Sequence, residues 1–533
     1  MKKIFTLFTI ACSLFIINYS LISCASHTPQ KPEQPVIVLF ENDVHCAIAG
    51  YASLAAMRTE LHKQTPYVAV VSAGDFAQGA AIGSLSRGES IIKVMNAVGY
   101  DAITIGNHEF DYGIPQQRKL MHMLDADVVC CNFTDNHNHL IYPPFTIHKY
   151  GNIKVAFVGA ATPTTFTSST PTFFEDKNGN CVYSFHADDT FELIQEAVNK
   201  ARRKGADYVI VLSHLGDDTV LDNSVDMIQS TTGIDAVFDG HQHHILNKTI
   251  TNAEGKPVIL ASTGTMFQRF GKLTIDTAGV VSVELINNEN FSKVDYEVQA
   301  VIDEIQDEMH DLVSNVVGYT EVPLTMLKNG ERETRRGETN LADFLTDAFR
   351  DATGADIGIM NGGGIRNQIK KAGDITFGDI YSIIPFNNTV RKLECTGQQL
   401  LDALEVGLTL APEENGDFFQ VSGLRYTYTT AVPSSVIFDN NNLFLGVGDT
   451  RRVLSAEVLR NGKWVPVQPD ATYTVGGQSY ILTNKGAAGA LQYMTEIEFE
   501  PIGDVKAVLN YLEKIGTVTK AQYGKPQNRI IAK

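Results

Sequence analysis

Histidine, carboxylate and carboxamide side chains recur in five short segments of the first half of the chain. The segments are Asp43-Val44-His45, Gly74-Asp75, Gly106-Asn107-His108-Glu109, Ser213-His214 and Gly240-His241-Gln242-His243. Imidazole nitrogens and carboxylate or amide oxygens are common ligands of divalent metals. The set offers more donors than one tetrahedral ion takes, and it suits two adjacent metals that share one carboxylate.

Each segment directly follows a short apolar run, which indicates a buried strand. The expected strands before these segments are residues 36–40, 68–72, 102–105, 208–212 and 236–238, with further strands at 128–131, 153–158 and 258–261. Helices are expected at 52–63, 90–98, 114–124, 190–204 and 220–230. In layered α/β proteins the carboxyl ends of strands form one rim, so the five polar segments should converge there.

The 533 residues allow several domains, and 44% hydrophobic with 20% charged residues is ordinary globular composition. The 43 basic residues face 61 acidic residues, which gives a formal net charge of -18. Such a chain repels a phosphate backbone, so nucleic acid polymers are not expected as partners.

The N-terminus has the pattern of an export signal. Lys2 and Lys3 precede an uncharged, mostly apolar run over residues 4–22, and Leu21-Ile22-Ser23-Cys24 resembles the lipobox of bacterial lipoproteins. We expect a signal peptide at 1–23, lipidation of Cys24, a Pro-rich tether at 24–34, and attachment to the periplasmic face of the outer membrane or to the cell surface. The alternative is an uncleaved anchor helix.

Three further segments complete the predicted organisation. Residues 35–295 form a catalytic α/β domain, and residues 296–316 have apolar positions at helical spacing, which predicts a linker helix. Residues 317–533 form a second α/β domain that contains a triple glycine and several strand-like runs.

The five polar segments, in this order, resemble the motif set of the calcineurin-like metallophosphoesterases. Asn107-His108-Glu109-Phe110-Asp111 and the second domain resemble the 5'-nucleotidase family, which includes bacterial 5'-nucleotidase/UDP-sugar hydrolases. The resemblance implies a four-layer αββα sandwich, then a C-terminal α/β substrate-binding domain. It implies release of phosphate from nucleoside 5'-phosphates by in-line attack of a hydroxide that bridges two metals.

The resemblance also assigns roles to residues in the first domain. Two divalent ions, such as Zn, Mn or Co, would be held by Asp43, His45, Asp75 and His243 and by Asp75, Asn107, His214 and His241, with Asp75 as the bridge. His108 is similar to the family's catalytic histidine, Asp111 would fix its tautomer, and Glu109 would orient other groups. The choice of His243 over His244 rests on family spacing alone.

In the second domain, three segments resemble the substrate-binding motifs of the family. Arginines would bind phosphate or ribose, and two aromatic rings would grip the base, as stacking on ring faces favours nucleosides. The implied substrate-binding residues are Arg332, Arg335, Asn361, Gly363, Gly364, Arg366, Phe386, Asn388 and Tyr480.

One segment departs from the family. After the second aromatic residue most members have Gly-Gly-Asp-Gly, whereas residues 483–489 here contain no acidic residue. The departure keeps two enzymatic alternatives open: UDP-sugar or dinucleotide pyrophosphatase activity and 2',3'-cyclic nucleotide phosphodiesterase activity. A third alternative is a non-catalytic surface lipoprotein that binds nucleotides or host ligands, and it is disfavoured because every expected metal ligand is present.

Overall fold

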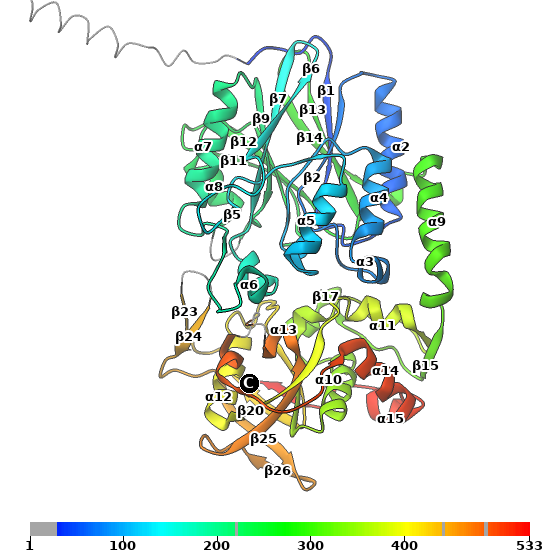
Figure 1. Ribbon diagram of the computed structural model, residues 1–533, viewed down its shortest axis with the longest axis vertical. Coiled ribbons are helices and arrows are strands. Elements are labelled where there is room, and N and C mark those ends of the chain that lie inside the picture. The colour runs from blue at the N-terminus through cyan, green and yellow to red at the C-terminus, as the bar shows by residue number, and fades with distance from the viewer. Residues whose placement is uncertain (1–28, 219–221, 440–442, 484, 486–488) are drawn as a thin grey trace, which may run out of the picture.

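The computed structural model describes residues 29–218, 222–439, 443–483, 485 and 489–533. The predicted signal peptide and the lipidation site Cys24 lie outside the described residues. Two bodies are stacked along the long axis, the first built from the N-terminal half and the second from the C-terminal half (Figure 1). Within the described residues, no helix combines the length and the apolar character that a bilayer crossing requires.

The first body contains two six-stranded mixed sheets. In one the order is β14 (Val281–Asn287), β13 (Arg269–Ile275), β1 (Val36–Glu41), β2 (Val68–Ser72), β3 (Ala102–Ile103) and β4 (Asp127–Val128). In the other it is β11 (Ile245–Thr251), β12 (Pro257–Thr263), β10 (Ala236–Asp239), β9 (Tyr208–His214), β7 (Ile153–Ala161) and β6 (Phe145–Tyr150). Strands β1 to β4 are parallel, as are β7, β9, β10 and β12.

The alternation of side chains along β1 shows how the layers pack. Val38 and Phe40 lie in the core between the two sheets, where the rings of Phe40 and Phe238 stack with centroids 3.7 Å apart. Ile37 and Leu39 point to the opposite face, into the core shared with helices. Both faces of this central strand are therefore buried, which explains its continuous apolar sequence.

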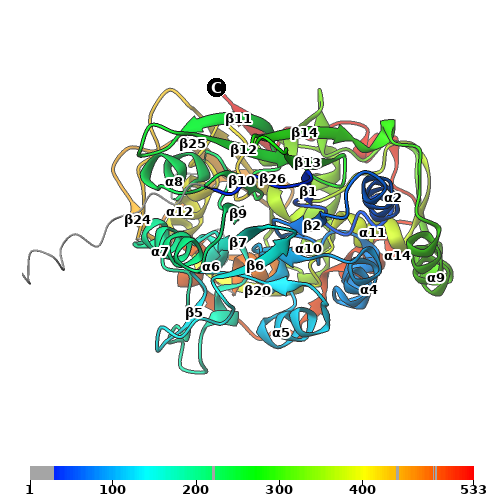
Figure 2. The same cartoon turned by 90° about the horizontal axis from the view of Figure 1, so that it is seen from above.

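Helices cover the outer face of each sheet (Figure 2). The helices over the first sheet are α2 (Gly50–His62), α4 (Glu89–Val98) and α5 (Ile114–Met123), and those over the second are α7 (Thr190–Arg203) and α8 (Ser224–Ser230). The short α3 (Ala81–Ser86) and α6 (Thr165–Ser168) lie at the end that faces the second body (Figure 1). This is the expected αββα sandwich, so the predicted fold class is confirmed.

Helix α9 (Tyr296–Val313) follows the sandwich in the chain and packs against α2, α4 and α11 (Phe377–Ile383). The sequence predicts a helix that continues to Val316, but Val316 instead begins strand β15 (Val316–Thr320), which pairs with β19 (Gly373–Thr376). The valines at 316 and 317 favour a strand, because β-branched side chains are restricted in helices.

The second body is built on a mixed sheet of order β21 (Phe419–Ser422), β18 (Ile357–Asn361), β27 (Thr472–Gln478), β20 (Thr389–Thr396) and β28 (Thr495–Glu496), with β29 (Ile502–Gly503) also on β20. A four-stranded sheet has the order β26 (Lys463–Pro466), β25 (Val453–Arg460), β22 (Leu424–Tyr428) and β30 (Ile530–Ala532). Its helices are α10 (Asn340–Thr353), α11, α12 (Gly397–Gly407), α13 (Ser479–Leu482), α14 (Asp504–Ile515) and α15 (Lys520–Tyr523). The pairs β16–β17 (Leu327–Lys328, Glu331–Arg332) and β23–β24 (Val436–Phe438, Phe444–Val447) belong to this body, whereas the pair β5–β8 (Thr134–Asp135, Tyr183–Ser184) belongs to the first.

The sequence did not predict β6, β11, β13 and β14, the antiparallel strands at or next to the sheet edges. Exposure alternates along β11 and along the first part of β14, and both carry polar residues on the open face. The predicted strand 128–131 is also shifted, because β4 ends at Val128 and the two cysteines that follow are buried in a loop.

The Pro-rich segment after residue 28 is not separate from the sandwich. The amide N of Gln30 donates to Asp207 Oδ1 at 3.1 Å, and the amide N of Glu33 donates to Asn152 Oδ1 at 3.1 Å. Residues 30–33, predicted as part of a free tether, therefore lie along the edge of the first body.

Candidate active site

The five polar segments converge at one end of the sandwich, as their positions after strands predict. They follow β1, β2, β3, β9 and β10, five strands whose carboxyl ends reach the same rim. Members of this set line a pocket that also contains residues of the second body. The strands thus deliver the candidate ligands to the junction between the two bodies.

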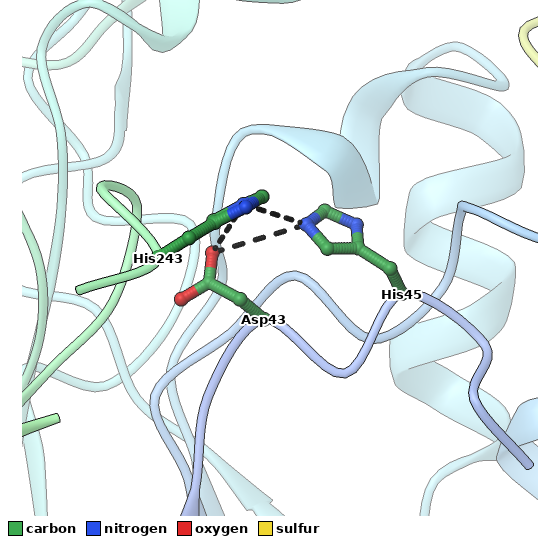
Figure 3. A group of neighbouring side chains, drawn as sticks. All are labelled: Asp43, His45 and His243. Atoms are coloured by element: carbon green, nitrogen blue, oxygen red, sulfur yellow. Dashed lines mark hydrogen bonds and ion pairs between the residues drawn. The ribbon is translucent and has the colours of Figure 1, made fainter. Parts of the chain in front are cut away.

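One group of possible metal ligands consists of Asp43, His45 and His243 (Figure 3). His45 Nε2 lies 3.0 Å from His243 Nε2, and His243 Nε2 lies 3.4 Å from Asp43 Oδ1. Asp43 is fully buried, and His45 is almost so. Three possible ligand atoms therefore lie close together, and the Asp43 carboxylate among them is shielded from water.

A second group consists of Asp43, Asp75 and His214. His214 Nε2 lies 3.1 Å from Asp75 Oδ2 and 3.9 Å from Asp43 Oδ1, and all three side chains are buried. Asn107 Oδ1 and His241 Nδ1 are 2.9 Å apart beside this group. Asp43 is the residue common to both groups, whereas the family resemblance assigns the bridge to Asp75.

The charge state of the imidazoles suits metal binding. Burial lowers the pKa of His241 to about 4, and burial with the nearby Arg366 charge lowers the pKa of His45 well below its usual range. Burial opposes protonation of His214 too, but the carboxylate of Asp75 raises its pKa to about 10. His45 and His241 therefore offer neutral ring nitrogens, whereas the carboxylates beside His214 favour a positive charge at that point.

A separate observation, at His214, also indicates that the donor set fits divalent metals. His214 Nε2 is buried and has no hydrogen-bond partner within the described part of the chain. It lies close to two carboxylates in a geometry that makes no hydrogen bond, although buried polar atoms are normally paired. Convergence of lone pairs without hydrogen bonds is what a cation-binding site requires.

Five of the candidate site residues have a left-handed backbone. Asp43, His45, Asp75, His241 and His243 all have positive φ, between 44° and 80°. Non-glycine residues rarely adopt this left-handed region, and such strain is typical of functional sites. The loops hold unfavourable conformations that aim five side chains at one place.

Glycines flank the ligands because nothing larger fits. A Cβ on Gly106 would lie 2.2 Å from Asp75 Oδ1, and one on Gly240 would lie 2.6 Å from His214 Nδ1. These contacts are shorter than carbon and oxygen or nitrogen can approach, so the two glycines are required by packing against the ligands.

Glu109 holds two of the loops together. Its carboxylate accepts hydrogen bonds from the backbone N–H groups of Asp75, Phe76, Ala77 and Gly106, at 2.6 to 3.1 Å. It is buried and lines neither ligand group. This placement agrees with the orienting role that the sequence predicts for it.

His108 and Asp111 form a pair at the entrance to the ligand groups. His108 Nδ1 lies 2.6 Å from Asp111 Oδ2, and the His108 backbone N donates to Asp75 Oδ1 at 2.8 Å. Burial opposes protonation of His108, but the Asp111 carboxylate raises its pKa above the usual value. Since Asp111 takes the Nδ1 side, Nε2 is left for a group in the pocket.

The pocket lies between the two bodies and has a volume of about 230 Å³. The first body contributes His108, Asp111 and four of the seven predicted metal ligands, Asp75, Asn107, His241 and His243. All nine predicted substrate-binding residues of the second body line the same pocket: Arg332, Arg335, Asn361, Gly363, Gly364, Arg366, Phe386, Asn388 and Tyr480. Residues as far apart in the sequence as Asp75 and Tyr480 therefore share one small-molecule site.

Comparison with known families accounts for both bodies. The calcineurin-like phosphoesterase family matches residues 37–244, and the C-terminal domain of 5'-nucleotidases matches residues 316–493. The chain thus combines a calcineurin-like phosphoesterase domain with the C-terminal domain of 5'-nucleotidases. This confirms the two domain types and the two-body fold that the sequence predicts.

Among the relatives of the chain, the trifunctional nucleotide phosphoesterase protein YfkN of Bacillus subtilis is 28% identical over 90% of the chain. The chain spans only 34% of that protein. A probable 5'-nucleotidase of Treponema pallidum is 24% identical, with 86% of this chain and 85% of the relative covered. The crystal structure of a 5'-nucleotidase precursor from Thermus thermophilus superposes with a TM-score of 0.78 at 25% identity, over 93% of this chain and 99% of that one.

Two arginines in the pocket are available for an anion. Arg332 is already paired, because its Nε donates to Glu414 Oε2 at 2.6 Å. Arg335 and Arg366 form no ion pair with any described carboxylate, and Arg366 lies 3.5 Å from His45 Nε2. Both arginines are partly buried, so their charges favour a bound anion.

Phe386 and Tyr480 are positioned by contacts on both sides of the pocket. The Phe386 ring lies 5.7 Å from the His108 ring and 5.7 Å from the Arg366 guanidinium carbon. Asn388 Oδ1 accepts from the Tyr480 backbone N at 3.1 Å, which leaves its amide nitrogen for a ligand. Tyr480 Oη donates to the Thr167 carbonyl of the first body at 2.9 Å.

The structure separates the two adjacent histidines of the 5'-nucleotidase motif. His243 belongs to the group with Asp43 and His45, whereas His244 Nδ1 lies 2.7 Å from Asp217 Oδ1 and is half exposed. Geometry therefore places His243 in the candidate metal centre.

Sequence reasoning missed part of the pocket wall. The residues it did not predict are Thr164, Thr167, Ser168, Thr170, Gln242, Gly416, Asp417 and Gln478. Thr164 to Thr170 form a hydroxyl-rich run next to a strand, and that run is the one signal that could have indicated them. Asp417 lies in a loop of ordinary composition, so only the fold brings it to the site.

Proposed function

We propose that the chain is a metal-dependent phosphohydrolase that releases phosphate from nucleoside 5'-phosphates. The observation that carries the proposal is the single pocket in which candidate metal ligands, two unpaired arginines and two aromatic residues meet. A phosphate ester joined to a base and a sugar is the ligand class that matches these three sets of groups. The relatives named as nucleotide phosphoesterase and 5'-nucleotidase support the same class.

Two divalent ions such as Zn, Mn or Co would be held by Asp43, His45, Asp75, Asn107, His214, His241 and His243. When bound, such ions acidify water and offset charge on phosphoryl oxygens. The chain itself would hold the phosphate with Arg366 and Arg335 and would aim His108 Nε2 at it. His108, held by Asp111, would stabilise the charge that develops or protonate the leaving oxygen.

The recognition residues would fix the rest of the substrate. Phe386 and Tyr480 would contact the base, and the free amide nitrogen of Asn388 would donate to its edge. Because Tyr480 and Phe386 both touch the first body, substrate binding and closure of the two bodies would be linked.

The test combines metal analysis with phosphate release from a panel of AMP, UMP, UDP-glucose, NAD and 2',3'-cyclic AMP. We expect bound divalent metal in the purified chain and release from the 5'-monophosphates that a chelator abolishes. Asp75→Asn and His108→Ala should each remove this activity, while the exposed His139→Ala serves as the matched control. Wild-type turnover in both active-site variants would contradict the proposal, and a preference for another panel member would change the substrate class.

We also propose that the chain is exported and attached to a membrane through lipidated Cys24. Support comes from the Leu21-Ile22-Ser23-Cys24 sequence and the apolar run before it. Anchoring would place the pocket outside the cytoplasm, where it would act on nucleotides in the surroundings of the cell.

A further inference from the structure

The Asp417 carboxylate lies in the wall of the pocket in an unusual environment. Within the described part of the chain, it accepts no hydrogen bond and forms no ion pair. Burial raises its pKa to about 7, although the nearby Arg335 charge opposes the rise. A carboxylate that lacks a partner and faces a ligand pocket is an acceptor without a donor.

The loop that carries Asp417 is held firmly against the glycine-rich loop of the pocket. The backbone N of Gly363 donates to the Gly416 carbonyl at 2.8 Å, and the backbone N of Gly362 donates to the Phe418 carbonyl at 2.8 Å. On the other side, the Asn415 backbone N donates to the Arg335 carbonyl at 2.8 Å. Asp417 is therefore fixed between the loop of Gly363 and the arginine segment.

Two neighbouring polar atoms on the same wall are also without partners. Asn361 Oδ1 and Arg335 Nε are buried and make no hydrogen bond with any described residue. Asn361 is only 4% exposed, and it lines the pocket with Asp417. Because buried polar groups are normally paired, this part of the wall is suited to a polar ligand group.

The ionised form of Asp417 restricts what that group can be. It would repel a phosphate and accept hydrogen bonds, so the group that it contacts in this form is a hydrogen-bond donor. The metal-ligand end of the pocket suits the phosphate and the aromatic end suits the base, which leaves the sugar as the part between them. Two vicinal hydroxyls can donate to the two oxygens of one carboxylate.

We propose that Asp417 is a specificity-determining residue that accepts hydrogen bonds from the sugar hydroxyls of the nucleoside. This assignment rests on the proposed function, because it takes a nucleotide as the ligand of the pocket. It predicts that the protein discriminates ribose from sugars without the 2' and 3' hydroxyls, and that Asp417 is the source of the discrimination.

The test measures binding of adenosine and 2',3'-dideoxyadenosine to the metal-loaded, full-length chain by calorimetry. Hydrogen bonds to a charged acceptor give about ten- to hundredfold tighter binding of adenosine by the wild-type chain. Asp417→Ala should bring the ratio to within about twofold, and Asp417→Asn, which keeps one acceptor oxygen, should give an intermediate ratio. Glu413→Ala, an exposed carboxylate in the same loop, is the matched control and should keep the wild-type ratio.

The remaining outcomes show which of the two proposals is wrong. If Asp417→Ala keeps the wild-type ratio, or if the wild-type chain shows no discrimination, the assignment is wrong. Purine riboside keeps the ribose of adenosine but lacks the amino group of the base. If Asp417→Ala weakens binding of adenosine but not of purine riboside, Asp417 contacts the base and the assignment is wrong. Phosphate release from AMP by the wild-type chain is measured separately: discrimination without release overturns the hydrolase proposal and leaves the Asp417 assignment standing.

Discussion

Lys485 of the second body forms an ion pair with Glu175 of the first body. Its Nζ lies 2.7 Å from Glu175 Oε1 and 3.0 Å from Oε2, and the Glu175 side chain is only 9% exposed. Lys485 lies in the segment where the sequence lacks the acidic residue usual in the family. Lys485 therefore joins the two bodies.

This pair should stabilise the closed arrangement of the two bodies. We expect Lys485→Glu and Glu175→Lys each to lower kcat/KM about threefold to tenfold, because a partly buried pair contributes about 1 kcal/mol. The double variant should recover most of the loss, since it restores opposite charges. Reversal of the exposed Lys200–Glu196 pair is the control. Losses that simply add in the double variant would show that the two residues act independently.

Gly106→Ala should weaken metal binding without unfolding the chain. The added Cβ would meet Asp75 Oδ1 at 2.2 Å and push the carboxylate away from His214. Displacing a ligand support typically lowers metal affinity about 10- to 100-fold. Metal content after dialysis against a weak chelator measures the effect. Gly446→Ala is the control, since a Cβ there meets nothing within 4 Å. Equal metal retention in both variants would show that Gly106 has no such role.

Asp111→Asn should lower kcat about 100-fold or more and leave metal content unchanged. Asp111 Oδ2 lies 2.6 Å from His108 Nδ1, and a neutral amide stabilises a positive imidazole much less than a carboxylate does. Single-turnover phosphate release from AMP measures the change, with KM determined in parallel. A variant with raised KM and unchanged kcat would place Asp111 in binding and not in the chemical step.

Asp504 predicts a pH dependence of stability. Burial raises its pKa in the folded chain to about 7, while the unfolded chain releases this proton near 3.8. Between these values the folded state binds more protons, so its stability falls as pH rises from about 4 to about 7. Asp504→Asn should remove this loss and stabilise the chain above pH 7 by on the order of 1–3 kcal/mol.

Thermal unfolding of the wild type and of Asp504→Asn across this pH range gives the difference. Gln478 Nε2, which donates to the Asp504 carboxylate at 2.7 Å, can turn its amide to accept from the new side chain. A constant difference in Tm between the two proteins at all pH values would be inconsistent with a raised pKa of Asp504.

Cys24→Ser should abolish lipid attachment. In cells fed a labelled fatty acid, the wild-type chain should carry the label and partition into detergent, whereas the variant should not. Cys46→Ser, at a buried cysteine of the sandwich, is the control. Labelling of the Cys24 variant would show that the anchor lies elsewhere.

The sequence by itself determined the parallel strands and the polar residues at their ends. Val36 to Phe40 is apolar at every position, and such a run has one stable place, inside a sheet covered on both faces. Asp43 and His45 follow it at once, so their position at the rim came with the strand. Edge strands such as β11 were not predictable in this way, because one face of the strand is exposed and polar residues interrupt the run of apolar side chains.

The tertiary structure decided which residues meet across the two bodies. It placed His243 beside His45 and turned His244 toward Asp217, although the two are neighbours in the chain, because the left-handed backbone at His243 reverses the direction of its side chain. It also brought Asp417 into the pocket through backbone hydrogen bonds to Gly363 and Gly362. The alternation of side chains along a strand determines which face each residue takes. Contacts between distant loops depend instead on how the two bodies pack together, and no local sequence pattern predicts that packing.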